Sequence, residues 1–384
     1  MSCKSSSHPA RMWKLSYPFK WHGYVQVSKK MCSINPTLNP TQQSTETKSK
    51  DNMDTKLTLS FLSILLLLFS SSLPTSASKC STRDRKVLLA IYSHFGSPAA
   101  LSSWRAPGVA CCDWAGVDCY MNSNRVRNLY FDKLNISGTI PAAIGDFPLL
   151  ESLTMTNMPK LIGNIPSSFT NLKRLVFLDL SRNSLSGQIP AFLSEISSLT
   201  FLDLSYNKFS GSIPPSIPKL RGVGALILSH NQLTGPIPDF SSFGDGNIFL
   251  QHNMLSGPIP KSLGGLGWSL LDLSFNRLSG DASFLFGAST PATEIHLQHN
   301  LIKFDMSHIT FPVRLTQLEL NNNYIYGSIP AQINEVTEFG LERFNVSYNL
   351  LCGKIPEGVV TQKFPIWNYF HNKCLCGKPL PPCK

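Results

Sequence analysis

Histidine and carboxylate side chains recur in this 384-residue chain at a regular interval of about 24 residues. The recurring residues are His230, His252, His296 and His299, together with Asp179, Asp203, Asp272 and Glu319. Imidazoles and carboxylates can ligate metals or transfer protons, but both tasks need groups that converge on one point. A constant interval instead returns each residue to the same place on a repeated unit. We therefore expect no metal, no cofactor and no catalytic site, and the chain is predicted not to be an enzyme.

The repeat is clearest in two consecutive segments. LVFLDLSRNSLSGQIP runs from Leu175 to Pro190, and LTFLDLSYNKFSGSIP ends at Pro214. Both have the form LxxLxLxxNxLxGxIP, and related segments extend from Val126 to Pro356. This period is typical of leucine-rich repeats. The Asn position is filled by Asn183, Asn207, Asn231, Asn253, Asn276, Asn300, Asn323 and Asn349, and two earlier coils carry Leu134 and Met158 there.

The repeat predicts an α/β solenoid, a right-handed curved array of ten plant-type coils. Each LxL is expected to form a short strand whose leucines enter the core, while the residues between them face the other way. The Asn amide is expected to bond backbone groups in the turn that follows. The G-x-I-P ending supplies a permissive backbone, a core residue and a chain stop. The stacked strands should form a parallel sheet on the concave side.

The residues at the variable positions of the repeat define a candidate protein-docking surface. The column between the strand leucines and its flanking columns place acids, imidazoles and aromatics on one face. The candidate residues are Asp179, Ser181, Arg182, Asp203, Tyr206, His230, Phe249, Gln251, His252, Asp272, Phe275, His296, Gln298 and Glu319, with His299 beside them. The alternative is that the Asp of L-D-L is a solvated residue of the repeat.

Charge and hydropathy bound the function classes. The formal net charge is +11, but residues 79–384 hold 25 basic and 20 acidic side chains without a dense basic run, which argues against nucleic acid. Residues 1–52 are polar, and we expect them to form a disordered extension. We hypothesise that translation starts at Met53 and that residues 1–52 are an upstream artefact or a minor isoform. Residues 53–78 have the charged, apolar and small-residue order of a secretory signal. No later stretch is apolar and long enough to span a membrane.

Eight cysteines flank the repeats and indicate stapled caps. Four precede the array (Cys80, Cys111, Cys112, Cys119) and four follow it (Cys352, Cys374, Cys376, Cys383). In a secreted chain such cysteines form disulfides, although their spacing does not give the pairing. The caps are expected at residues 79–121 and 358–384, around repeats at 122–357, because an open-ended solenoid exposes its core. Trp104 and Trp114 should plug the N-terminal end, where Ser81 and Asp84 resemble a capping box.

The chain resembles the plant polygalacturonase-inhibiting proteins. The resemblance covers the opening CSTRDRKVLLAIYSHFG and CCDWAGVDC, the closing YFHNKCLCGKPLPPCK, and two irregular coils, GDASFLFG after Leu278 and NLIKFDMSHITFP from Asn300 to Pro312. It implies the pairs Cys80–Cys111, Cys112–Cys119, Cys352–Cys374 and Cys376–Cys383. It also implies a secreted, monomeric cell-wall glycoprotein that docks on fungal or insect polygalacturonase through its concave face. Asp203 and Asp272 match acidic positions of that family's binding face, and cell-wall pectin is a second expected partner.

Two features qualify this functional expectation. Ile227, Phe249 and His296 interrupt the acidic column, so the range of enzymes inhibited is not given by the resemblance. Glycosylation sequons start at Asn135 and Asn345, and a glycan on Asn345 would limit the C-terminal part of the surface. The alternative function is a signalling module that recognises a peptide, a receptor ectodomain or a pectin fragment in plant development.

Overall fold

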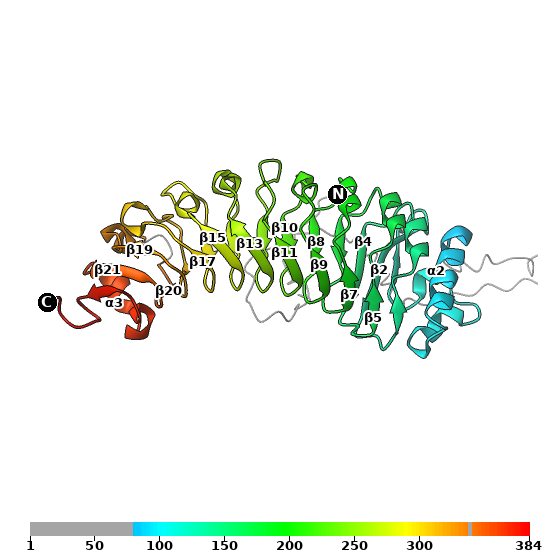
Figure 1. The fold of residues 1–384 in the computed structure, drawn as a ribbon. Helices are drawn as coiled ribbons and strands as arrows, with labels where there is room; N and C mark the ends of the chain where they lie inside the picture. The colour runs from blue at the N-terminus through cyan, green and yellow to red at the C-terminus, as the bar shows by residue number, and fades with distance from the viewer. Residues whose placement is uncertain (1–79, 337–339) are drawn as a thin grey trace, which may run out of the picture. The chain divides into compact units, whose positions relative to one another are not determined.

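The fold is a solenoid built from two ladders of short parallel strands (Figure 1). The computed structural model describes residues 80–336 and 340–384, so the proposed extension and signal segment lie outside the described residues. Ten consecutive parallel strands, one for each predicted coil, form the long sheet together with one antiparallel strand from the N-terminal cap. The predicted repeat architecture is confirmed.

The long sheet has eleven strands in chain order. They are β1 (Val117–Cys119), β2 (Val126–Asp132), β4 (Ser152–Thr156), β6 (Phe177–Asp179), β8 (Phe201–Asp203), β10 (Ala225–Ile227), β12 (Asn247–Phe249), β14 (Leu270–Asp272), β16 (Glu294–His296), β18 (Gln317–Glu319) and β20 (Arg343–Asn345). Equivalent residues pair across neighbouring coils, as in Asp179 with Asp203.

A second sheet follows the turn after each long-sheet strand. It has eight strands: β3 (Gly138–Thr139), β5 (Leu161–Gly163), β7 (Ser184–Gly187), β9 (Lys208–Gly211), β11 (Gln232–Gly235), β13 (Met254–Pro258), β15 (Arg277–Gly280) and β17 (Leu301–Ile302). It stops there, and β19 (Tyr326–Gly327), β21 (Leu350–Lys354) and β22 (Cys374–Cys376) form a separate sheet. Most coils return through a 3₁₀ turn, for example η5 (Ala191–Glu195), η8 (Ser283–Leu285) and η9 (Met306–His308).

The repeated leucines and isoleucines fill one continuous apolar core. The strand leucines Leu178 and Leu180 are fully buried, and so are their counterparts Leu202 and Leu204 in the next coil. The Ile of G-x-I-P is buried as well, as at Ile189. The core therefore runs along the whole stack and must be closed at both ends.

The repeated Asn closes its own turn and joins the preceding coil through two further hydrogen bonds. The Asn207 Oδ1 atom accepts from the backbone N–H of Leu185 in the preceding coil at 2.9 Å. Its Nδ2 atom donates to the carbonyl oxygens of Leu180 and Leu204 at 2.8 and 3.2 Å. All four residues are buried, so these bonds satisfy backbone groups that water does not reach. The pattern continues into the C-terminal cap at Asn372, which accepts from the N–H of Leu351.

The N-terminal cap covers the first coil with tryptophan. The helix α2 (Thr82–His94) packs beside the 3₁₀ helix η1 (Ala99–Arg105). Trp104 is fully buried, and its ring lies 5.7 Å from that of Trp114 and 5.8 Å from that of Phe131 in the first coil. The predicted plug is confirmed.

The expected capping box is wrong, because Asp84 has a different partner. The Ser81 side chain makes no capping bond to α2. The buried Asp84 carboxylate instead accepts from Arg125 at 2.8 and 3.0 Å and from the backbone N–H of Val126 at 2.8 Å. Asp84 therefore fastens the cap helix to the first long-sheet coil, and an ion pair across that junction outcompetes the local cap.

Among the described residues, the disulfides lie at the two ends of the coil array. The bonded pairs are Cys80–Cys111, Cys112–Cys119, Cys352–Cys374 and Cys376–Cys383, the same pairs that the family resemblance implies. The C-terminal cap also contains α3 (Val359–Lys363) and the 3₁₀ helix η11 (Ile366–Tyr369), whose Tyr369 is fully buried. Among residues 80–336 and 340–384, no helix has the length and apolar character needed to cross a bilayer.

Replacing Asn207 with alanine should destabilise the solenoid strongly. The substitution leaves a buried N–H and two buried carbonyls without their partner, and each such group costs about 1–3 kcal/mol. Thermal or urea unfolding of Asn207→Ala measures the loss. Asn171→Ala is the control, since Asn171 is exposed on a 3₁₀ turn, and equal stability of the two variants would contradict the role of the ladder.

Candidate functional site

A continuous stack of rings lies in the turns that follow five neighbouring strands of the long sheet. We define the ring stack as Tyr206, His230, His252, Phe275 and His299, one residue from each of five consecutive coils. Neighbouring ring centroids are 4.0, 4.2, 4.2 and 4.3 Å apart, and the rings are inclined by at most 17° to each other. The Arg182 guanidinium closes one end at 4.1 Å from the Tyr206 ring centre, which is a cation–π contact.

The backbone forces these side chains into register. Each member of the ring stack directly precedes the repeated Asn position and has φ between 53° and 55°, the left-handed region that side-chain-bearing residues seldom adopt. The cost is offset because each backbone N–H bonds the next coil, as Tyr206 N–H does to the Ser229 carbonyl at 3.0 Å. The repeat thus determines the position, and the residue type is free to vary.

The stack presents a rigid and partly exposed surface. Tyr206 and Phe275 are each 37% exposed, and His252 and His299 are exposed as well. Stacking covers both faces of the interior rings, so a partner can reach only ring edges, imidazole nitrogens and the tyrosine hydroxyl. Because the rings hold each other in place, little side-chain entropy remains to be lost on binding.

Protonation would disrupt the stack. The pKa of His230 is lowered to about 4 by burial, by His252 and by Arg182. Burial and His252 also lower the pKa of His299. Stacked imidazoles that touch cannot both carry charge without repulsion. His230 is therefore neutral in the folded protein at mildly acid pH.

The acidic column does not face solvent as expected. Asp203 is 0% and Asp179 is 6% exposed, and His296 is also buried. Phe177 and Phe201, two residues before the aspartates, stack on one side at 4.4 Å. Arg182 and Tyr206 come three residues after the two aspartates, and the serines between them, Ser181 and Ser205, are buried as well. Asp179, Asp203 and His296 therefore offer little or no surface to a partner in this structure, and their contact with one stays a prediction.

The aspartates instead act within their own turns. Oδ1 of Asp179 accepts from the N–H of Ser181 at 2.9 Å, Asp203 bonds Ser205 in the same way at 2.8 Å, and Asp272 bonds Ser274 at 3.0 Å. Ser181 is also buried. The recurring D-L-S is thus a backbone-bonding element, and the solvated interpretation does not describe its buried aspartates Asp179 and Asp203.

Asp179 and Asp203 form a buried pair with unusual acidity. They are register neighbours on β6 and β8, and Oδ2 of Asp203 has no hydrogen-bond partner among the described residues. Burial and the Asp179 charge raise the pKa of Asp203 to about 7. Burial also raises the pKa of Asp179, against its bonds to Ser181. One proton is therefore retained by the pair at mildly acid pH.

The remaining candidates lie further along the same face. Asp272, His296 and Glu319 pair in register on β14, β16 and β18, and His296 counteracts the rise that burial causes in the pKa of both carboxyls. Phe249 on β12 is half-buried. Gln251 and Gln298 occupy the Ser position of their coils, and each has a buried Oε1 without a described partner.

Sequence reasoning missed the Phe177–Phe201 pair. Their signal was present, because both residues precede the L-D-L of consecutive coils. Cys80, Cys111 and Cys112 are the only metal-like cluster found within the described residues, and all three are in disulfides, which leaves no thiolate to bind an ion.

Comparison with known proteins gives consistent matches. Residues 81–120 match the leucine rich repeat N-terminal domain and residues 162–209 match the leucine rich repeat. The chain is 50% identical to a polygalacturonase inhibitor of Pyrus communis over 84% of this chain and 98% of that one. It is also 50% identical to polygalacturonase inhibitor 2 of Arabidopsis thaliana, over 86% and 100%. Among solved structures, a plant ice-binding protein is 42% identical with a TM-score of 0.76, over 80% of this chain and 99% of that one.

Asp203→Asn should change the pH dependence of stability. The folded pKa of about 7 lies above the ordinary value of 3.8, so unfolding releases a proton between these limits. The stabilising contribution is complete below about pH 4 and is lost as the pH rises through 7. Melting temperatures measured from pH 4 to 7.5 should show the variant gaining on the wild type as pH rises, because the variant has no buried carboxyl group at position 203 to ionise.

Asp239→Asn is the control with the opposite sign. Bonds from Ser241 and Ser262 lower the pKa of the exposed Asp239, so its contribution is present above the ordinary pKa and is lost in acid. A wild-type and Asp203→Asn difference that stays constant with pH would contradict the raised acidity of the buried pair.

Proposed function

Because this chain belongs to the plant polygalacturonase-inhibitor family of leucine-rich repeat proteins, we propose that it is a secreted inhibitor that docks on fungal or insect polygalacturonase and limits pectin degradation. Proteins of this family are binding proteins and not enzymes, so inhibition requires only that the substrate cleft or its approach be covered. Four disulfides suit an extracellular compartment. We further propose that it acts as a monomer in the cell wall, where pectin is a second partner.

The observation that carries the proposal is the ring stack with Arg182. Tyrosine and arginine dominate the energetics of protein interfaces, and aromatic residues are enriched in them. Here the ring stack and Arg182 form a connected, preorganised strip over six consecutive coils. The partner surface that fits has acidic groups for Arg182 and hydrogen-bonding side chains for the imidazole edges.

The buried acids support the strip without forming it. Asp203 cannot contact a partner because it has no exposed surface, but its turn positions Tyr206 three residues later. Half-buried Asp272 and Glu319 extend the candidate surface beyond the stack. The effect of acidic residues on binding is thus expected to be mostly indirect at Asp203 and more direct at Asp272 and Glu319.

Truncating the exposed rings should weaken inhibition. We expect Tyr206→Ala and Phe275→Ala each to raise the inhibition constant about tenfold, which corresponds to about 1.4 kcal/mol. The measurement is reducing-end release by a panel of fungal polygalacturonases incubated with residues 79–384. Met254→Ala is the control, because Met254 is similarly exposed but lies on the second sheet.

Two outcomes would redirect the assignment. Unchanged inhibition by both ring variants would remove the ring stack from the docking surface. Absence of inhibition by the wild type across the panel, combined with saturable binding to a plant receptor ectodomain or an oligogalacturonide, would instead favour a signalling module in development.

We also propose that a glycan on Asn345 bounds the docking surface toward the C-terminal cap. Asn345 ends β20, and its Oδ1 accepts from the N–H and hydroxyl of Ser347 at 3.1 and 2.8 Å. That leaves the Nδ2 atom, which carries an N-linked glycan, without a described hydrogen bond. Glycopeptide mapping should find Asn345 occupied, together with the exposed Asn135. A bare Asn345 in the secreted protein would contradict this boundary.

A further inference from the structure

An irregular coil interrupts the second sheet and creates a cavity. In regular coils a glycine with positive φ lies four residues after the repeated Asn, as Gly280 does after Asn276 with φ of 80°. After Asn300 that position is Phe304, whose buried ring packs 5.7 Å from the Phe286 ring. The second sheet ends at β17, and only an isolated bridge between Asp305 and Tyr326 leads to β19.

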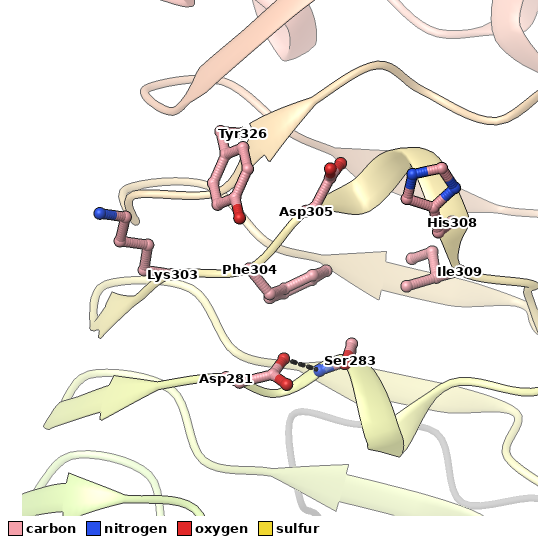
Figure 2. Close-up of a pocket in the computed structure, with 8 residues that line it drawn as sticks. All are labelled: Asp281, Ser283, Lys303, Phe304, Asp305, His308, Ile309 and Tyr326. Atoms are coloured by element: carbon pink, nitrogen blue, oxygen red, sulfur yellow. Dashed lines mark hydrogen bonds between the residues drawn. The ribbon is translucent and has the colours of Figure 1, made fainter.

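The cavity at this break has a volume of about 420 Å³ (Figure 2). Its lining comes from three successive coils and combines aromatic, acidic and basic groups: Asp281, Lys303, Phe304, Asp305, His308 and Tyr326. Figure 2 shows Tyr326 and Asp305 on one side and Asp281 on the other, with the Phe304 ring between them. The volume is in the range of small-ligand sites.

Much of the hydrogen-bonding capacity of this lining is unused. Oδ1 of Asp281 accepts from the N–H of Ser283 at 2.8 Å, which accounts for one of its two oxygens. Oδ1 of Asp305 accepts from the N–H of Ser307 at 2.9 Å, and the Ser307 side chain is a second partner of that carboxylate. Within residues 80–336 and 340–384, the side chains of Lys303, His308 and Tyr326 make no described hydrogen bond. Local turn structure therefore explains only part of the polar lining.

The charges select against anions and favour a neutral polyol. Two carboxylates outnumber the single ammonium group of Lys303, so a polyuronate would be repelled. Sugar hydroxyls both donate and accept, which matches free carboxylate oxygens on one hand and Lys303 on the other. Tyr326 is 41% exposed and offers an aromatic surface, while buried Phe304 and Ile309 supply an apolar floor.

We propose that this cavity binds a neutral pyranose unit of a glycan, with an apolar sugar face against Tyr326 and hydroxyls bonded to Asp281, Asp305 and Lys303. None of the lining residues belongs to the long sheet or the ring stack. The proposal is therefore independent of polygalacturonase docking, and a variant of the cavity should keep full inhibition.

Ligand-observed and protein-observed NMR titrations test the site with three probes: cellotetraose, β-1,4-galactotetraose and trigalacturonate. At least one neutral tetraose should bind saturably, and trigalacturonate should bind more weakly than it does. Tyr326→Ala should weaken that binding at least tenfold, and Asp281→Asn should weaken it several-fold. Tyr324→Ala is the matched control, because Tyr324 is also exposed but does not line the cavity.

Melting temperatures of the variants would verify that they fold. The proposal is overturned if neither neutral probe saturates, if Tyr326→Ala binds like the wild type, if Tyr324→Ala loses as much affinity as Tyr326→Ala, or if trigalacturonate binds most tightly. Loss of polygalacturonase inhibition in Tyr326→Ala would contradict the separation of the two sites.

Discussion

The structure depends on the buried asparagine that connects each coil to the one before it. A solenoid leaves the backbone groups of every turn away from water, and no regular helix or sheet satisfies them. One amide per coil supplies both a donor and an acceptor, so a single residue closes its own turn and joins the preceding one. The same geometry reaches Asn372, so the C-terminal cap begins as an eleventh turn before its disulfides end the stack.

This constraint also places the binding surface. The residue before each asparagine is held in a left-handed conformation, and its N–H is bonded to the next coil. Side chains at that position must therefore lie one above another. When five consecutive coils carry rings at that position, the rings stack without any further requirement. The fixed backbone position thus produces a rigid surface, and the ring edges differ with the residue type.

The two titrating features of the long-sheet face respond oppositely to pH. The raised pKa values of Asp179 and Asp203 make the pair stabilise the fold most in acid. The pKa of His230 is lowered from 6.5 to about 4, so its contribution makes the fold gain stability as the pH rises between these two values. These opposing slopes partly cancel in mildly acidic solution. The acids and imidazoles thus tune the conditions under which the surface exists, in addition to any contact made by its exposed members.

Coil number, core leucines, asparagine bonding and the tryptophan plug could all be predicted from the sequence, because each follows from a local pattern that repeats. The burial of Asp203 was not predicted, since alternation along a strand gives the direction of a side chain but not what neighbouring coils pack around it. The cavity beside Phe304 likewise required the fold: the sequence showed an irregular coil, but only three stacked coils show what space it leaves. The sequence by itself determines the coil, because the residues that form it recur in a short local pattern. Burial and surface chemistry depend on contacts between neighbouring coils, whose residues lie about one repeat apart in the sequence.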